Sequence, residues 1–286
     1  MSIYSKILVA IDGSLTSLHA LEEFFKLAQN EGNRITVVSV IPPYIGDLAL
    51  VAVGDIIAAI KKPWEEALKK AQELADKHKV LIKTVCEEGE PYERIIDLAQ
   101  AENCDLIVMG RRGLKRLERV LLGSVTARVI GYSPIDVLVV TKDTFVGWQR
   151  ILLATDGSKY SEPATRRAID LASSYGGEIK VISVVDVPPE FYAESPKTVD
   201  ELITKTKGYV EAVKRNAEGV GVSTESFVRE GESYKVIADM AEQLKVNIIV
   251  MGSHGRTGLE RLLMGSVTEK VIGHTDRAVL VVKSGF

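Results

Sequence analysis

The chain has 286 residues, of which 46% are hydrophobic and 26% charged, and its formal net charge is −3 at pH 7. This composition is typical of a globular protein with two domains of ordinary size, and it excludes extensive disorder and a global positive field for nucleic acid. The two cysteines, Cys86 and Cys104, belong to no CxxC motif or Cys/His cluster, so neither a disulfide framework nor a zinc site is indicated.

In the first half, short β-branched or apolar runs alternate with segments of helical periodicity. The predicted strands are 7–11, 35–41, 81–86, 106–109 and 137–140. Four of these runs are almost continuously apolar, as expected of parallel strands that are buried on both faces. The order predicts a β-α-β-α-β-α-β-α-β layer.

A longer stretch, 42–62, follows the second strand and begins with two prolines. We expect a variable loop or a short helix there, beside the ligand crevice, and the same for 186–198 in the second half. The apolar residues 48–60 are interrupted by Gly54 and Asp55, and the first residues form no apolar leader. No membrane association is therefore expected, and we expect a cytoplasmic location.

The second half of the chain repeats the first. The run 6–14 is matched by 150–158, and 106–110 is matched by 248–252. The corresponding predicted strands are 151–155, 179–185, 223–228, 248–251 and 279–282. A repeat this long is a domain duplication. The sequence therefore predicts an α/β fold of two tandem five-stranded parallel-sheet domains, 1–143 and 148–286, each with strand order 3-2-1-4-5.

A glycine pattern follows the fourth strand of each half. Gly110, Gly113 and Gly123-Ser124 in the first half correspond to Gly252, Gly255 and Gly265-Ser266 in the second. Glycine permits positive φ and close approach to a polyanion, and the Gly-Ser pair opens a helix whose free amides would bind phosphates.

An aspartate, Asp12 or Asp156, ends the first strand of each half. Strands one and four are neighbours in the predicted order, so this carboxylate faces the glycine pattern at the point where the strand order reverses. It would accept hydrogen bonds from ribose hydroxyls or help to hold Mg²⁺. The alternative is that the glycines serve only as turn residues.

Both motifs resemble those of the ATP-binding members of the universal stress protein family, which carry G-2x-G-9x-G-S/T after strand four and an Asp after strand one. The resemblance covers essentially the whole chain, and the run 251–267 is its most specific part. It implies a Rossmann-like, adenine nucleotide alpha hydrolase-like fold in each half. It also implies that ATP, ADP or AMP binds there, with Mg²⁺ held through the phosphates.

The resemblance implies a nucleotide-binding set in each half. In the second half the set is Ala154, Thr155, Asp156, Val184, Met251, Gly252, His254, Gly255, Gly265, Ser266 and Val267. In the first half it is Ala10, Ile11, Asp12, Val40, Met109, Gly110, Arg112, Gly113, Gly123, Ser124 and Val125.

The first half departs from the family pattern within its loop. Arg111 and Arg112 stand where the second half has Ser253 and His254, and Lys115 and Arg116 replace Thr257 and Gly258. These cations form either a phosphate clamp or a solvated loop face. We therefore expect the second half to keep the fuller loop chemistry.

The function that these motifs indicate is a nucleotide-responsive stress protein that binds ATP and acts through protein partners. The enzyme alternative is slow ATP hydrolysis or autophosphorylation at Ser124 or Ser266, although no neighbouring base is evident. A nucleotide-free scaffold is a third alternative. The last strand of each half is expected at a sheet edge, where the resemblance implies an internal pseudo-dimer and allows this pseudo-dimer to form a further homodimer.

Overall fold

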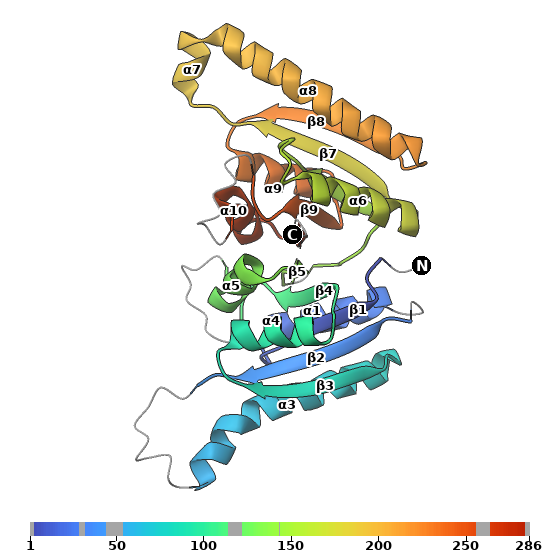
Figure 1. The fold of residues 1–286 in the computed structure, drawn as a ribbon, viewed down its shortest axis with the longest axis vertical. Helices are drawn as coiled ribbons and strands as arrows, with labels where there is room; N and C mark the ends of the chain where they lie inside the picture. Colours follow the sequence, from blue (N-terminus) through green and yellow to red (C-terminus); the bar gives the residue numbers. More distant parts are fainter. Residues whose placement is uncertain are drawn as a thin grey trace. The chain divides into compact units, whose positions relative to one another are not determined.

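The computed structural model describes residues 3–28, 32–43, 54–113, 122–142, 144–255 and 264–283. Contacts between Cα atoms divide the chain into two compact units, Ser2–Asp143 and Thr144–Phe286. We call them the N-terminal unit and the C-terminal unit. Figure 1 shows a sheet with flanking helices in each of them.

The N-terminal unit has strands β1 (Lys6–Ala10), β2 (Arg34–Ile41), β3 (Ile82–Glu88), β4 (Leu106–Gly110) and β5 (Asp136–Val140). Its helices are α1 (Leu15–Ala28), α3 (Gly54–His78), α4 (Pro91–Ala101) and α5 (Ser124–Tyr132). The strands are parallel in the order β3-β2-β1-β4-β5, which confirms the predicted topology. Helices α1 and α3 pack together, as do α4 and α5.

The C-terminal unit repeats this arrangement. Its strands are β6 (Arg150–Ala154), β7 (Glu178–Val185), β8 (Thr224–Glu230), β9 (Ile248–Gly252) and β10 (Ala278–Val282). They are parallel in the order β8-β7-β6-β9-β10. The helices are α6 (Glu162–Tyr175), α7 (Pro189–Glu194), α8 (Pro196–Gly219), α9 (Ser233–Gln243) and α10 (Ser266–His274).

The stretches expected to be loops or short helices are more helical than the sequence indicated. Residues 54–62 form the first turns of the long helix α3, which continues through Pro63. In the C-terminal unit, α7 is the short helix expected, but α8 already begins at Pro196. Proline is favoured in the first turn of a helix because the amide that it lacks has no partner there. Residues 44–53 lie outside the described residues.

The segment that joins the two repeats packs with the C-terminal unit. The Thr144 hydroxyl donates to the carbonyl of Asp276 at 2.7 Å. Val146 and Trp148 are buried, and the indole ring of Trp148 stacks on Tyr175 with 6.0 Å between ring centroids. This segment is therefore part of a folded core.

None of the helices in the described ranges combines the length and the apolar composition needed to cross a bilayer. The same ranges contain no group of three or more His, Cys, Asp or Glu side chains able to hold a metal ion.

Candidate nucleotide site

Strand register places three of the predicted residues of each unit on one face of its sheet. Ala10 is in register with Val38 and with Met109, and Val40 follows Val38 by two residues. Residues in register point to the same face, and so do residues two apart along a strand. Ala10, Val40 and Met109 therefore share a face, at the carboxyl ends of their strands.

Helix α4 covers that face in the N-terminal unit. Thr36 lies on the same face, because it is two residues before Val38. Its hydroxyl donates a hydrogen bond of 2.5 Å to the carboxylate of Glu102, which is the C-cap residue of α4. The Ala10, Val40 and Met109 side chains are thus on the α4–α5 side of the sheet.

The same register holds in the C-terminal unit. Ala154 pairs with Ile182, two residues before Val184, and Val250, next to Met251, pairs with Leu153. The neighbouring position Val181 is in register with Ser226, whose hydroxyl bonds to Glu211 of α8. Ala154, Val184 and Met251 therefore face away from α8, on the α9–α10 side.

Two of the predicted residues are placed differently. Ile11 and Thr155 follow Ala10 and Ala154 in extended backbone, so their side chains point to the opposite face of the sheet. The Thr155 hydroxyl donates to the Ser161 hydroxyl at 3.0 Å, beside the first turn of α6. The structure does not group these two side chains with the others, and only their backbone atoms are available to a ligand on the α4–α5 or α9–α10 side.

Each strand-end aspartate lies directly against a glycine of the loop. A Cβ atom built on Gly255 would lie 2.9 Å from Oδ2 of Asp156, and one built on Gly113 would overlap Oδ2 of Asp12. The expectation that carboxylate and glycine pattern meet is therefore confirmed in both units.

The other oxygen of each aspartate holds the turn that follows it. Oδ1 of Asp12 accepts from the Ser14 amide at 3.0 Å. Oδ1 of Asp156 accepts from the Ser158 amide at 3.0 Å and from its hydroxyl at 2.7 Å. The turns pass through Gly13 and Gly157, whose φ angles are +78° and +72°.

These two turn glycines were missed in the sequence, although an Asp-Gly-Ser motif repeated in both halves is a recognisable turn signal.

The six glycines of the predicted pattern have no positive φ, which corrects the expectation that they supply unusual backbone angles. They allow close packing instead. A Cβ on Gly252 would lie 2.9 Å from the Tyr160 carbonyl oxygen, and one on Gly265 would lie 3.3 Å from the Ser253 carbonyl oxygen. The Gly265 amide donates to that Ser253 oxygen at 2.9 Å, which closes the loop at its base.

A helix opens at the second end of each loop. Helices α5 and α10 begin at Ser124 and Ser266, and their N-cap residues, Gly123 and Gly265, offer no side chain to cap the first amides. Both serines are exposed, and Val267 is 37% exposed. Uncapped amides at a helix start, together with the helix dipole, favour an anion at this point.

The two loops differ in charge. Arg111 and Arg112 belong to the N-terminal loop, whereas Ser253 is buried in the C-terminal one with its hydroxyl 3.1 Å from Nδ1 of His254. Glu269 adds a negative charge to the first turn of α10. The positions of Lys115, Arg116, Thr257 and Gly258 lie outside the described residues.

The two units thus define a class of protein: a duplicated α/β chain with an aspartate and a glycine loop at the switch point of each parallel sheet. Residues 3–141 and 147–283 match the sequence model of the universal stress protein family, and the chain belongs to this family.

Relatives cover one repeat or both. The chain is 39% identical over 140 residues to a universal stress protein of Methanocaldococcus jannaschii, a match that covers 48% of this chain and 82% of that one. It is 28% identical over 296 residues to one of Mycolicibacterium smegmatis, covering 97% and 96%. The fold is that of a universal stress protein structure from Archaeoglobus fulgidus, with TM-score 0.75, 24% identity, and coverage of 98% and 96%.

Proposed function

We propose that each unit binds an adenine nucleotide at the carboxyl edge of its sheet. The base lies beside the alanine, valine and methionine on the α4–α5 or α9–α10 side, and the aspartate Oδ2 accepts from ribose hydroxyls. The phosphates bind the glycine loop and the first amides of α5 or α10. With ATP bound, Mg²⁺ would be held mainly by phosphate oxygens.

One observation carries this proposal. In both units a carboxylate and an uncapped helix start lie at the two ends of one glycine loop, and the carboxylate touches that loop through Gly113 or Gly255. A nucleotide presents the matching groups, because its ribose donates hydrogen bonds and its phosphates accept them.

We infer from this arrangement a regulatory role in which the bound nucleotide, rather than its chemistry, is the signal. Hydrolysis or autophosphorylation remains the competing function, because Ser124 and Ser266 present exposed hydroxyls where the phosphates would lie. Mass spectrometry of the chain after incubation with ATP and Mg²⁺ distinguishes the regulatory role from autophosphorylation. A phosphorylated serine at either position would assign the protein to the enzyme class.

The proposal is tested with Ser266→Asp in the C-terminal unit and Ser124→Asp in the N-terminal unit. Both residues are exposed at the start of a helix, where a carboxylate stabilises the helix, so the fold is retained. The new charge repels phosphate. Calorimetric titration with ATP and Mg²⁺ is expected to give two sites per unmodified chain, one per single variant and none for the double variant.

The matched controls are Ser266→Ala and Ser124→Ala, which remove a hydroxyl without adding charge and are expected to keep both sites. If the aspartate variants bind as many nucleotides as the unmodified chain, the phosphates do not lie on these helices. No binding to the unmodified chain would favour the scaffold alternative.

A further inference from the structure

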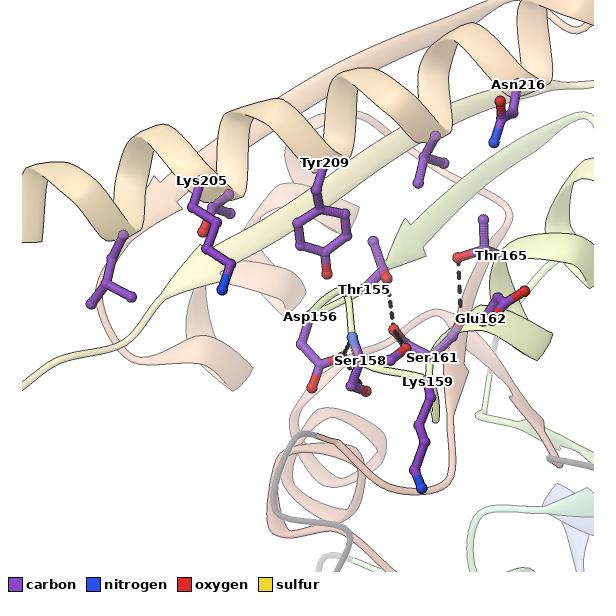
Figure 2. A pocket seen from close by; sticks show the side chains of 14 residues that line it. Thr155, Asp156, Ser158, Lys159, Ser161, Glu162, Thr165, Lys205, Tyr209 and Asn216 are labelled. Atoms are coloured by element: carbon purple, nitrogen blue, oxygen red, sulfur yellow. Dashed lines mark hydrogen bonds between the residues drawn. The ribbon is translucent and has the colours of Figure 1, made fainter.

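A cavity of about 750 Å³ lies between α6 and α8 in the C-terminal unit (Figure 2). Thr155 and the first turns of α6 line one wall, and Tyr209 and Asn216 of α8 line the other. Its volume falls within the roughly 300–1,000 Å³ typical of small-molecule pockets. The Thr155 side chain points into this side of the sheet, so the cavity lies on the opposite face from Ala154, Val184 and Met251.

In the N-terminal unit the equivalent helices, α1 and α3, contact each other. There Glu22 of α1 accepts from Lys77 of α3 at 2.9 Å and lies 3.1 Å from Nε2 of His78, so the two helices are tied together. Ala67 of α3 lies over the turn glycine, with its Cβ 3.2 Å from a Cβ built on Gly13.

The C-terminal unit places a tyrosine at that point. The ring of Tyr209 lies over Gly157, where any Cβ would overlap it, and Figure 2 shows the ring directed from α8 toward this turn. Helix α8 packs on β7 and β8 as α3 packs on β2 and β3, and α3 also packs on α1. Tyr209 therefore lies between α8 and the turn that precedes α6, where it lines the cavity.

The carboxylates at the cavity are already engaged. Asp156 accepts the two hydrogen bonds from Ser158. Glu162 lies 3.4 Å from the guanidinium of Arg166 in an i,i+4 ion pair. A cationic ligand would have to compete with both arrangements.

Two lysines and an amide also line the cavity, and Lys159 lies over the ring of Tyr160, 5.1 Å from its centroid. Within the described residues, Lys205 makes no ion pair, and Figure 2 shows its side chain extending from α8 toward the turn at Asp156. The Asn216 amide stands at the far end of the same helix face. Between them, the Tyr209 ring and the side chain of Val213 provide apolar surface. Ammonium, amide and aromatic surface together suit a flat molecule with an anionic group.

We infer that the α6–α8 cavity is a second ligand site of the C-terminal unit, which takes a small organic anion. The anionic group pairs with Lys205, and the flat apolar part lies between Tyr209 and Val213. The site is distinct from the proposed nucleotide site, since the two lie on opposite faces of the sheet, and they meet at Thr155 and the turn at Asp156.

The experiment uses the full chain and the aromatic sulfonate 8-anilinonaphthalene-1-sulfonate as the probe, with its fluorescence measured during titration. Lys205→Gln is expected to weaken binding roughly three- to tenfold, the usual effect of losing one charge-assisted contact. The matched control is Lys207→Gln, an exposed lysine of the same helix that does not line the cavity. This variant is expected to bind like the unmodified chain. Saturating ATP is expected to leave the probe bound.

The inference is overturned if the unmodified chain does not bind the probe, or if the two lysine variants bind it equally well. Displacement of the probe by ATP would also overturn it, because the probe would then occupy the nucleotide site. Amide spectra of the labelled chain give an independent readout. Shifts confined to 155–165 and 202–216 support the cavity, and shifts at 252–255 and 264–267 contradict it.

Discussion

The aspartate that ends the first strand is held from two directions in each unit. Its Oδ1 is fixed by the amide two residues later, and its Oδ2 occupies the space left by a glycine that lacks a Cβ. This arrangement orients a carboxylate toward the proposed ligand crevice before any ligand arrives. Such preorganisation reduces the cost of ordering the side chain on binding.

Gly255→Ala tests this contact. The added methyl would lie 2.9 Å from Oδ2 of Asp156, so the aspartate or the loop must move. We expect the free energy of unfolding to fall by about 1–3 kcal/mol, as for other overpacked sites, and ATP to bind less tightly to the C-terminal unit. Chemical denaturation and calorimetric titration measure the two effects.

The control is Gly208→Ala in α8, where an added Cβ would meet nothing within 4 Å. Removing a glycine from a helix interior should raise the free energy of unfolding by about 0.5–1 kcal/mol. Equal stability changes in the two variants would mean that Gly255 has no special packing role.

The glycine pattern identified the loop after the fourth strand of each unit, but the glycines serve close packing there and not the positive φ angles that the sequence suggested. Its spacing could be recognised because both halves keep it, but the backbone angles and the close contacts of Gly252 and Gly265 depend on chain segments far away in sequence. Tyr209 could not be identified at all, since its position over Gly157 depends on how α8 lies on the sheet.

At the scale of the elements, Glu22 of α1 links this helix to Lys77 and His78 of α3. Hydrogen bonds from Lys77 and His78 lower the pKa of Glu22 from 4.5 to about 2. A carboxyl group whose pKa is lowered by folding stabilises the native state above its unfolded pKa, and this contribution is lost as the pH falls through the folded value.

Glu22→Gln should therefore lower the free energy of unfolding at pH 7, by about 1 kcal/mol because Lys77 is largely solvated. The difference from the unmodified chain should shrink as the pH falls from 4.5 toward 2. Denaturation curves at several pH values measure it. A difference that stays constant through this range would show that the ionised carboxylate is not responsible.

The connecting segment allows a second prediction about an element. Trp148 is 4% exposed and stacks on Tyr175, so Trp148→Ala should remove about 3–5 kcal/mol of stability from the C-terminal unit. Phe145→Ala is the control, because Phe145 is 64% exposed and its loss should change stability by less than about 0.5 kcal/mol. Thermal unfolding of the two variants is compared by far-ultraviolet circular dichroism, which follows the backbone rather than the tryptophan side chain. Similar melting temperatures for the two variants would contradict the packing of this segment.

The strands were predictable because each central strand is a nearly continuous apolar run, and β1, β4, β6 and β9 have the same bounds to within a residue or two. The starts of the long helices were harder to locate. Prolines before them resemble loop signals, yet Pro189 and Pro196 lie in the first turns of α7 and α8, and Pro63 lies within α3. These prolines are exposed, and local sequence signals do not distinguish a helix from a loop at such positions.

At the scale of the whole molecule, duplication has left two units with one topology and different surroundings. The N-terminal unit has two arginines in its loop and an α1–α3 contact. The C-terminal unit has Ser253 and His254 in its loop and an open cavity beside α8. We therefore expect binding at the N-terminal loop to depend more strongly on salt, since the attraction between these half-buried arginines and phosphates weakens as ionic strength rises.

The most direct test of the account is a crystal structure of the full chain grown with ATP and Mg²⁺. The account predicts one nucleotide in each unit, on the α4–α5 or α9–α10 side, with phosphate oxygens within hydrogen-bond distance of the Ser124 and Ser266 amides. A nucleotide bound only between α6 and α8, or no nucleotide at either glycine loop, would contradict it.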